Sequence, residues 1–156
     1  MNIKKLTALL CAVVMVLSLA ACGSGSGDKA ENKHYTVGIC QLVQHDALDA
    51  ATKGFRDAIT DALGAENVTF DEQNAAGDSA TCATICNGFV SSGVDLILAN
   101  ATGALQAAAA ATKDIPILGT AVTEYGVALG IDNFSGTVGG NISGTSDLAP
   151  LDQQAA

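Results

Sequence analysis

The chain has 156 residues, hydrophobic residues at 49% of its positions and a formal net charge of −9. Nucleic-acid-binding domains carry a basic face, and this acidic sequence has no lysine or arginine cluster that would form one, so we expect no nucleic acid partner. Aromatic residues make up only 4% of the chain while alanine and glycine are abundant, which favours a tightly packed α/β layer structure over a β-sandwich.

The N-terminal segment has the pattern of an export signal. Lys4 and Lys5 precede an apolar run that extends from Leu6 to Leu19, and small residues follow that run. A basic start, an apolar stretch and a small-residue cleavage site are typical of a secretory signal peptide. The run is shorter than the about 20 apolar residues of a spanning helix, so an uncleaved anchor is disfavoured. We predict a signal peptide over residues 1–21.

The residues at the predicted cleavage site, Leu19-Ala20-Ala21-Cys22, resemble the lipobox of bacterial lipoproteins. That resemblance implies that Cys22 is lipidated, becomes the first mature residue and anchors the protein to the extracytoplasmic face of a bacterial cell membrane. An ordinary signal peptide with an incidental Cys22 is the alternative. Residues 22–34 are rich in glycine and serine, which is typical of a flexible tether.

Strand and helix patterns alternate after this tether. Buried apolar runs predict strands, and these cover residues 35–41, 67–74, 94–100 and 115–119, with a short fifth strand over 127–131. Residues 132–146 are rich in glycine and short polar residues, so we expect a loop there. The alternation predicts an open parallel sheet with helices on both faces, an α/β structure of flavodoxin-like type.

Apolar residues at helical spacing predict three helices between the strands. The first begins at Asp46, a candidate N-cap, and ends at Gly64. The second begins at Asp78 or Ser79, and the third begins at Thr102. The buried face of the first helix is expected to hold Leu48, Ala51, Phe55, Ile59, Ala62 and Leu63.

Short polar residues follow the predicted strands, at the edge where open parallel sheets bind ligands. The segments that fall at this edge are residues 41–46, 73–79, 100–103 and 119–125. Free N–H groups and the positive dipole end of a helix favour an anion there, and a carboxylate suffices. The sequence predicts a small carboxylated ligand such as an amino acid, although helix capping alone also explains such residues.

Motifs for catalysis or cofactor binding are missing from the sequence. It contains no Gly-x-Ser-x-Gly elbow and no phosphate loop, so we expect no enzyme and no cofactor. Removal of the signal and lipidation of Cys22 leave Cys40, Cys82 and Cys86, an odd number for a disulfide framework. We expect these three to be small buried hydrophobic residues and predict no metal site, while the pairing of Cys82 with Cys86 stays open.

The ordered segments resemble the substrate-binding lipoproteins of bacterial ABC transporters, in the family with tryptophan- and tyrosine-binding members. The resemblance rests on residues 37–49, 74–78, 95–102, 108–113, 115–123 and 139–147. It implies a type I periplasmic-binding fold, in which two α/β lobes close over a ligand by a hinge motion. Residues 35–146 would then form the N-terminal lobe and residues 147–156 the crossover to a second lobe, so we expect the chain to be a fragment.

The resemblance also implies which residues face the ligand, namely Gln41, His45, Asn74, Ala101, Thr102, Thr120, Ala121, Val122 and Asp147. Backbone and hydroxyl groups of Thr102 and residues 120–123 are expected to hold a carboxylate, and Asp147 or a carbonyl to hold an ammonium group. The implied partners are an amino acid or related molecule, an ABC permease and, through the lipid, the membrane. A surface sensor or adaptor with the same fold and a flavodoxin-like enzyme are the alternatives.

Overall fold

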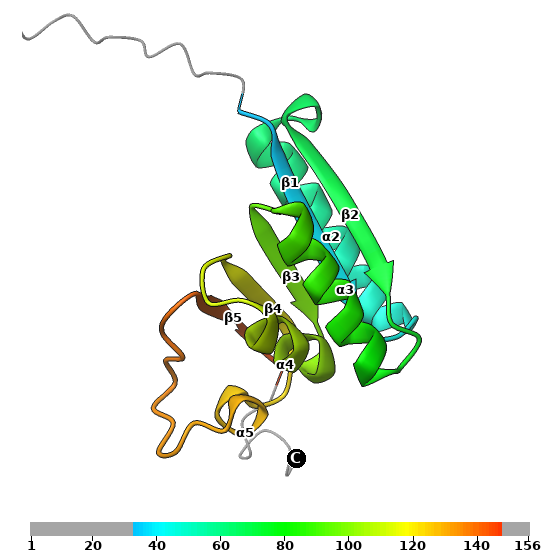
Figure 1. Ribbon diagram of the computed structural model, residues 1–156. Coiled ribbons are helices and arrows are strands. Elements are labelled where there is room, and N and C mark those ends of the chain that lie inside the picture. Colours follow the sequence, from blue (N-terminus) through cyan, green and yellow to red (C-terminus); the bar gives the residue numbers. More distant parts are fainter. Residues whose placement is uncertain (1–32, 148–156) are drawn as a thin grey trace, which may run out of the picture. The chain divides into compact units, whose positions relative to one another are not determined.

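A computed structural model describes residues 33–147, which contain one five-stranded parallel sheet with helices on both faces (Figure 1). The strand order is β2-β1-β3-β4-β5. The strands are β1 (Tyr35–Gln41), β2 (Val68–Asn74), β3 (Leu96–Asn100), β4 (Ile117–Val122) and β5 (Ile142–Ser146). The helices are α2 (Asp46–Leu63), α3 (Ser79–Ser92), α4 (Thr102–Ala111) and α5 (Tyr125–Leu129), with a 3-10 turn, η2 (Ala65–Asn67). The predicted fold class is confirmed.

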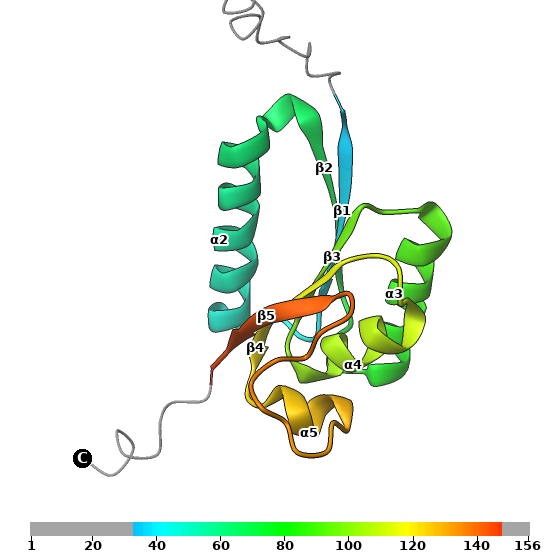
Figure 2. The same ribbon diagram turned by 90° about the vertical axis from the view of Figure 1, so that its left-hand side faces the viewer.

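The core has two layers, one on each face of the sheet, because side chains alternate along each strand. On one face, Val37, Ile39 and Leu98 pack under α2. On the other face, Cys40 and Ile97 belong to a larger cluster with α3 and α4. Figure 2 shows the same division, with α2 on one side of the sheet and α3 and α4 on the opposite side.

The start and the buried face of α2 differ in part from the prediction. The N-cap is His45, whose side chain accepts a hydrogen bond from Ala47 N, so the prediction of Asp46 as the cap was wrong. Ala62 is exposed although it was expected to be buried. The fully buried residue of α2 is Thr52, a polar residue that a hydrophobic pattern cannot detect. The stripe that packs on the sheet includes Phe55, Ile59 and Leu63, as predicted.

The last third of the lobe corrects two further predictions. Residues 125–129 form α5, so the fifth strand predicted over 127–131 is wrong. The Glu124 carboxylate accepts from the N–H groups of Gly126 and Val127, and this cap turns a short apolar run into a helix. The actual fifth strand, β5, lies in the predicted loop. It has one apolar residue, Ile142, and forms by pairing with β4, so its own sequence carries no strand signal.

The other strands agree with the prediction to within a few residues. β4 begins directly after Pro116, as the missing N–H of proline requires, and extends to Val122. His34, assigned to the tether, bonds to the Glu66 carbonyl (3.1 Å) and to the Thr69 hydroxyl (2.7 Å), so this residue is joined to η2 and β2.

Several predictions lie outside the described residues: the signal peptide over 1–21, lipidation at Cys22, nearly all of the tether, and the crossover beyond Asp147. Within residues 33–147, no helix combines the length and the hydrophobicity that crossing a bilayer requires.

β1 and α3 approach each other closely at Gly38. A Cβ added to Gly38 would lie 2.7 Å from two atoms of the Phe89 ring, and Phe89 is fully buried. The ring therefore has no free space to move into, and the contact between this strand and this helix requires glycine.

We predict that Gly38→Ala lowers the free energy of unfolding by about 1–3 kcal/mol, because the added methyl group overpacks the core against Phe89. Gly54→Ala is the matched control. Gly54 lies in the exposed part of α2, and a methyl group added there would have no neighbouring atom within 4 Å, so this change should be neutral or stabilising by up to about 1 kcal/mol. Denaturant unfolding of both variants measures the difference, and equal effects would contradict the steric explanation.

Candidate functional site

The carboxyl ends of four strands bring polar side chains into one row across the sheet. In the parallel register, Gln41 pairs with Asn74 on one side and with Asn100 on the other. Asn100 in turn pairs with Thr120. Register partners in a parallel sheet project from the same face, so all four side chains leave the sheet on the α2 side. The structure therefore gathers Gln41, Asn74 and Thr120, as predicted, and adds Asn100.

Gln41 is buried, with 5% of its surface exposed, and its amide is bonded within the chain. Its Nε2 donates to the Val43 carbonyl (3.0 Å) and to the Asp49 carboxylate (2.6 Å). Its Oε1 accepts from the Thr52 hydroxyl (2.7 Å). In this structure the Gln41 side chain thus orients the 42–45 turn and the first turns of α2.

Asn100 is fully buried and connects β3 to α2. Its Nδ2 donates to the Leu48 carbonyl (2.8 Å) and to the Thr52 hydroxyl (2.9 Å), and lies 3.4 Å from the Gln41 Oε1. Its Oδ1 is buried with no partner among the described residues. The predicted site set did not include Asn100. The available signal was an amide at the end of a strand that is otherwise apolar, since buried amides need hydrogen-bond partners.

Alanines with a positive φ lie at the carboxyl ends of three strands: Ala76 and Ala101 follow β2 and β3, and Ala121 lies near the end of β4, where its pairing with β5 is irregular. The angles are 53° at Ala76, 89° at Ala101 and 52° at Ala121. Residues other than glycine adopt this region rarely, at a cost of about 1–3 kcal/mol each, and such strain clusters at ligand clamps and active sites. Two of these alanines, Ala101 and Ala121, belong to the predicted site.

Among the α-helices of residues 33–147, α4 alone has no side-chain cap at its N-terminus. His45 caps α2 and Asp78 caps α3, each by accepting a backbone N–H. Glu124 caps α5 in the same way. The N-cap residue of α4 is Ala101, which has no side-chain acceptor. The first intrahelical bond is from Leu105 N to the Ala101 carbonyl (3.0 Å), so the N–H groups of residues 102–104 are left to another acceptor.

Two predicted polar residues stay exposed at this edge. Asn74 uses its Oδ1 to accept from Ala76 N (2.8 Å), which leaves its NH₂ group as a donor, and it borders a hollow of about 400 Å³ between α2 and β2. His45 accepts from Ala47 N at Nδ1 (3.2 Å). In the neutral ring this acceptor role puts the proton on Nε2, which therefore remains a donor.

Val122 and Asp147 occupy different environments. Val122 is fully buried in the core, and its carbonyl accepts from Asp147 N (3.0 Å). The structure therefore does not bring the Val122 side chain to the polar edge. The Asp147 side chain is exposed, and it is the last described residue.

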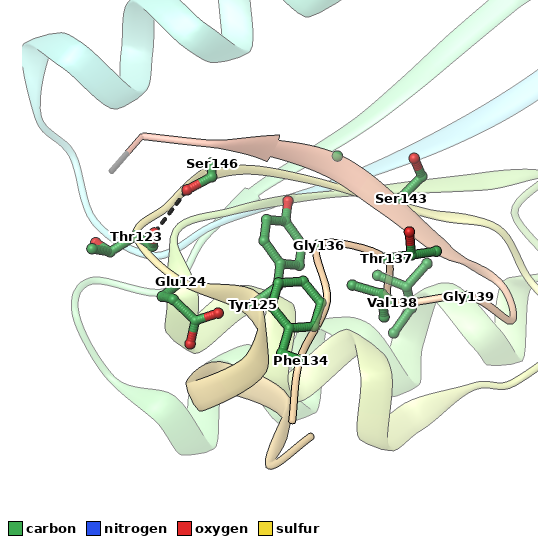
Figure 3. Close-up of a pocket in the computed structure, with 12 residues that line it drawn as sticks. Thr123, Glu124, Tyr125, Phe134, Gly136, Thr137, Val138, Gly139, Ser143 and Ser146 are labelled. Atoms are coloured by element: carbon green, nitrogen blue, oxygen red, sulfur yellow. Dashed lines mark hydrogen bonds between the residues drawn. The ribbon is translucent and has the colours of Figure 1, made fainter. Parts of the chain in front are cut away.

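A cavity of about 600 Å³ lies between α5, residues 134–139 and β5 (Figure 3). Its principal polar groups are bonded within the chain. The Glu124 carboxylate caps α5, the Tyr125 hydroxyl donates to the Thr145 carbonyl (3.3 Å), and the Ser146 hydroxyl donates to the Thr123 carbonyl (2.7 Å). We therefore place the candidate site at the polar edge beside α4, where polar groups remain available.

Tyr125 was missed by sequence reasoning and has a structural role. Its ring lies against β4 and β5 at Gly119 and Gly144, which pair with each other, and a Cβ at either glycine would collide with its hydroxyl. Burial raises the pKa of Tyr125, and the charge of Asp147 adds to that shift, so the phenol stays protonated and keeps its hydrogen bond.

We predict that Asn100→Ala lowers the free energy of unfolding by about 2–4 kcal/mol, because buried acceptors lose their donor and a cavity is left. Asn74→Ala is the matched control at the exposed end of the same row, where the loss should stay below about 1 kcal/mol. Urea unfolding compares the two variants. Similar losses of unfolding free energy in the two variants would show that burial of the Asn100 amide does not account for the destabilisation.

Over residues 36–156 the chain matches the family model described as ABC transporter substrate binding protein. It is 42% identical to a tyrosine-binding protein from Clostridioides difficile (strain R20291), over 96% of this chain and 46% of that protein. The chain thus spans about half the length of this curated relative.

Solved structures agree with this match. A ligand-free, open substrate-binding protein with adhesive properties from Clostridium difficile has 45% identity and a TM-score of 0.69, over 76% of this chain and 41% of that one. An ABC domain in complex with L-Trp from Streptococcus pneumonia has 33% identity and a TM-score of 0.69, over 78% and 41%. The parallel sheet, the polar edge and these matches together show that the chain belongs to the ABC transporter substrate-binding protein family.

Proposed function

We propose that this chain is the N-terminal lobe of an extracytoplasmic solute-binding protein, which captures a carboxylated amino acid and delivers it to an ABC permease. The family supports the transporter role, and the relatives named for tyrosine or solved with L-Trp support the amino acid. A chain that spans 46% of its relative supplies one wall of the cleft, and a second lobe closes over the ligand. No catalytic step belongs to this function.

The N-terminus of α4 is the observation that carries the proposal. Uncapped N–H groups and the helix dipole, which is equivalent to about half a positive charge, favour a carboxylate at this position. Ala101 N donates to the Thr120 carbonyl (2.9 Å), so the turn after β3 is joined to the end of β4. The strained alanines Ala101 and Ala121 lie at these two places, where the backbone is held ready for a ligand.

The other members of the predicted set take different roles in this proposal. Thr102 and Thr120 supply hydroxyl groups near the carboxylate, and exposed Asp147 binds the ammonium group. His45 Nε2 and the Asn74 NH₂ group supply donors from the rim, because the hydrogen bonds to Ala47 N and Ala76 N use only Nδ1 and Oδ1 of these side chains. Buried Gln41 positions the 42–45 turn.

We predict that Thr102→Asp weakens the binding of L-tyrosine or L-tryptophan by about tenfold or more, because a carboxylate then repels the ligand carboxylate at the N-terminus of α4. Thr102→Asn introduces a side chain of almost the same shape as aspartate but without its charge, so the affinity of this variant should stay within a few-fold of the parent's. Isothermal titration calorimetry on the full gene product measures both. An acidic residue in the first turn favours the helix, so unfolding does not explain the loss.

Two results would contradict this assignment. Equal affinities of the Thr102→Asp and Thr102→Asn variants would place the carboxylate elsewhere. Binding of tyramine, which lacks the carboxylate, as tightly as L-tyrosine would show that the α4 N-terminus does not recognise an acid group.

We also propose that Cys22 carries the lipid that holds the protein at the outer face of the cytoplasmic membrane. The lipobox-like residues 19–22 and the glycine- and serine-rich segment after them support this anchor. Expression in a bacterium with a labelled fatty acid should label the parent chain and move it to the membrane fraction. Cys22→Ser should abolish both effects, and an unlabelled mature protein with a different N-terminus would refute lipidation.

A surface role without transport is the second candidate, because the Clostridium difficile structural relative has adhesive properties. A sensor or adaptor with the same fold would bind its ligand and leave uptake unchanged. Uptake of a labelled amino acid by a strain that lacks the gene separates the two functions, since only the transport function predicts reduced uptake.

A further inference from the structure

Three thiols meet inside the core, away from the polar edge that binds the ligand. Cys40 lies near the end of β1, and Cys82 and Cys86 lie one turn apart on α3. All three are fully buried and unpaired. Together they belong to the buried cluster on the α3 side of the sheet, and Cys40 interacts with both helix thiols.

Neither a metal site nor a disulfide within α3 fits this cluster. Within residues 33–147, no group of three His, Cys, Asp or Glu side chains is arranged to hold a metal ion. Residues four apart on a helix have Cβ atoms about 5–6 Å apart, whereas a disulfide needs about 3.5–4.5 Å. A bond between Cys82 and Cys86 would therefore distort the helix, and Cys40 is the partner that remains.

We propose that Cys40 and Cys86 form a disulfide when the chain folds in an oxidising compartment, which joins β1 to the middle of α3. The inference rests on the proposed export of the protein, which brings the chain into an oxidising compartment. Its chemistry is independent of ligand binding, so the two proposals can fail separately.

The bond forms by two exchanges with a small-molecule disulfide as oxidant. The Cys86 thiolate attacks one sulfur of the oxidant, which breaks the oxidant's S–S bond and releases one thiolate. The Cys40 sulfur then attacks the Cys86 sulfur of the mixed disulfide and releases the second thiolate. The two protein thiols lose two electrons and two protons, and the oxidant becomes two thiols.

The position of α3 along β1 favours Cys86 as the partner of Cys40. The Phe89 ring lies on Gly38, and α3 runs antiparallel to β1 because it connects the parallel strands β2 and β3. From Gly38 to Cys40 the strand advances by about 6.6 Å. From Phe89, α3 runs back by about 4.5 Å to Cys86 and by about 10.5 Å to Cys82, so Cys86 is closer to the level of Cys40. Because the folded core shields all three sulfurs from solvent, the exchange takes place during folding, before α3 closes onto β1.

The test uses the 156-residue chain with Cys11→Ser and Cys22→Ser, so that only the core thiols remain. The protein is refolded from denaturant with a mixture of reduced and oxidised glutathione, denatured again and alkylated with iodoacetamide. Mass spectrometry should find one alkylated cysteine and a Cys40–Cys86 cross-linked peptide, and the melting temperature should exceed that of the protein refolded with reductant. Three alkylated cysteines, or a cross-link between Cys82 and Cys86, would overturn the proposal.

Two alanine variants identify the partner of Cys40 and keep the core apolar. Cys82→Ala should retain the cross-link and the higher melting temperature of the oxidised protein, whereas Cys86→Ala should lose both. Circular dichroism checks that each variant folds. The reverse pattern, in which Cys82→Ala loses the cross-link and Cys86→Ala keeps it, would assign the bond to Cys82 and refute the proposed pair.

Discussion

The buried hydrogen bonds among Gln41, Thr52 and Asn100 hold the carboxyl edge of the sheet in place. They join the end of β1 and the second turn of α2, which follow each other in the chain, to the end of β3, which is distant in sequence. Buried amides are costly without partners, so the network specifies one arrangement of these ends. The turns that begin at these strand ends, including the turn into α4, inherit their positions from this arrangement.

That arrangement explains how the edge sustains strained backbone. Ala101 and Ala121 adopt positive φ angles that alanine avoids, the first directly after β3 and the second near the end of β4. The bond from Ala101 N to the Thr120 carbonyl links these two strand ends. The N-terminus of α4, which begins beside this bond, has no side-chain cap, and this is the feature on which the proposed carboxylate site rests.

The fold could be predicted wherever the apolar pattern was strong. The runs ending at Gln41 and Asn100 are buried on both faces and read as strands, and Gly64 ended α2 as expected. The apolar pattern failed where a paired strand or a capping side chain determines the local structure. β5 exists through its pairing with β4, and α5 exists because Glu124 caps it. For the site, the sequence placed residues 100–103 at the ligand edge, and only the structure showed that Asn100 is fully buried and bonded to α2.

The sequence by itself determined the class of the protein, the alternation of strands and helices, and the edge of the sheet that collects polar turns. These features follow from local periodicity and from short polar residues at strand ends, and the sequence contains both without any tertiary contact. Only the tertiary structure decided that Gln41 is buried while Asn74 is exposed, and that Cys40 meets the thiols of α3. Each of these depends on contacts between residues distant in sequence, and no local pattern encodes such contacts.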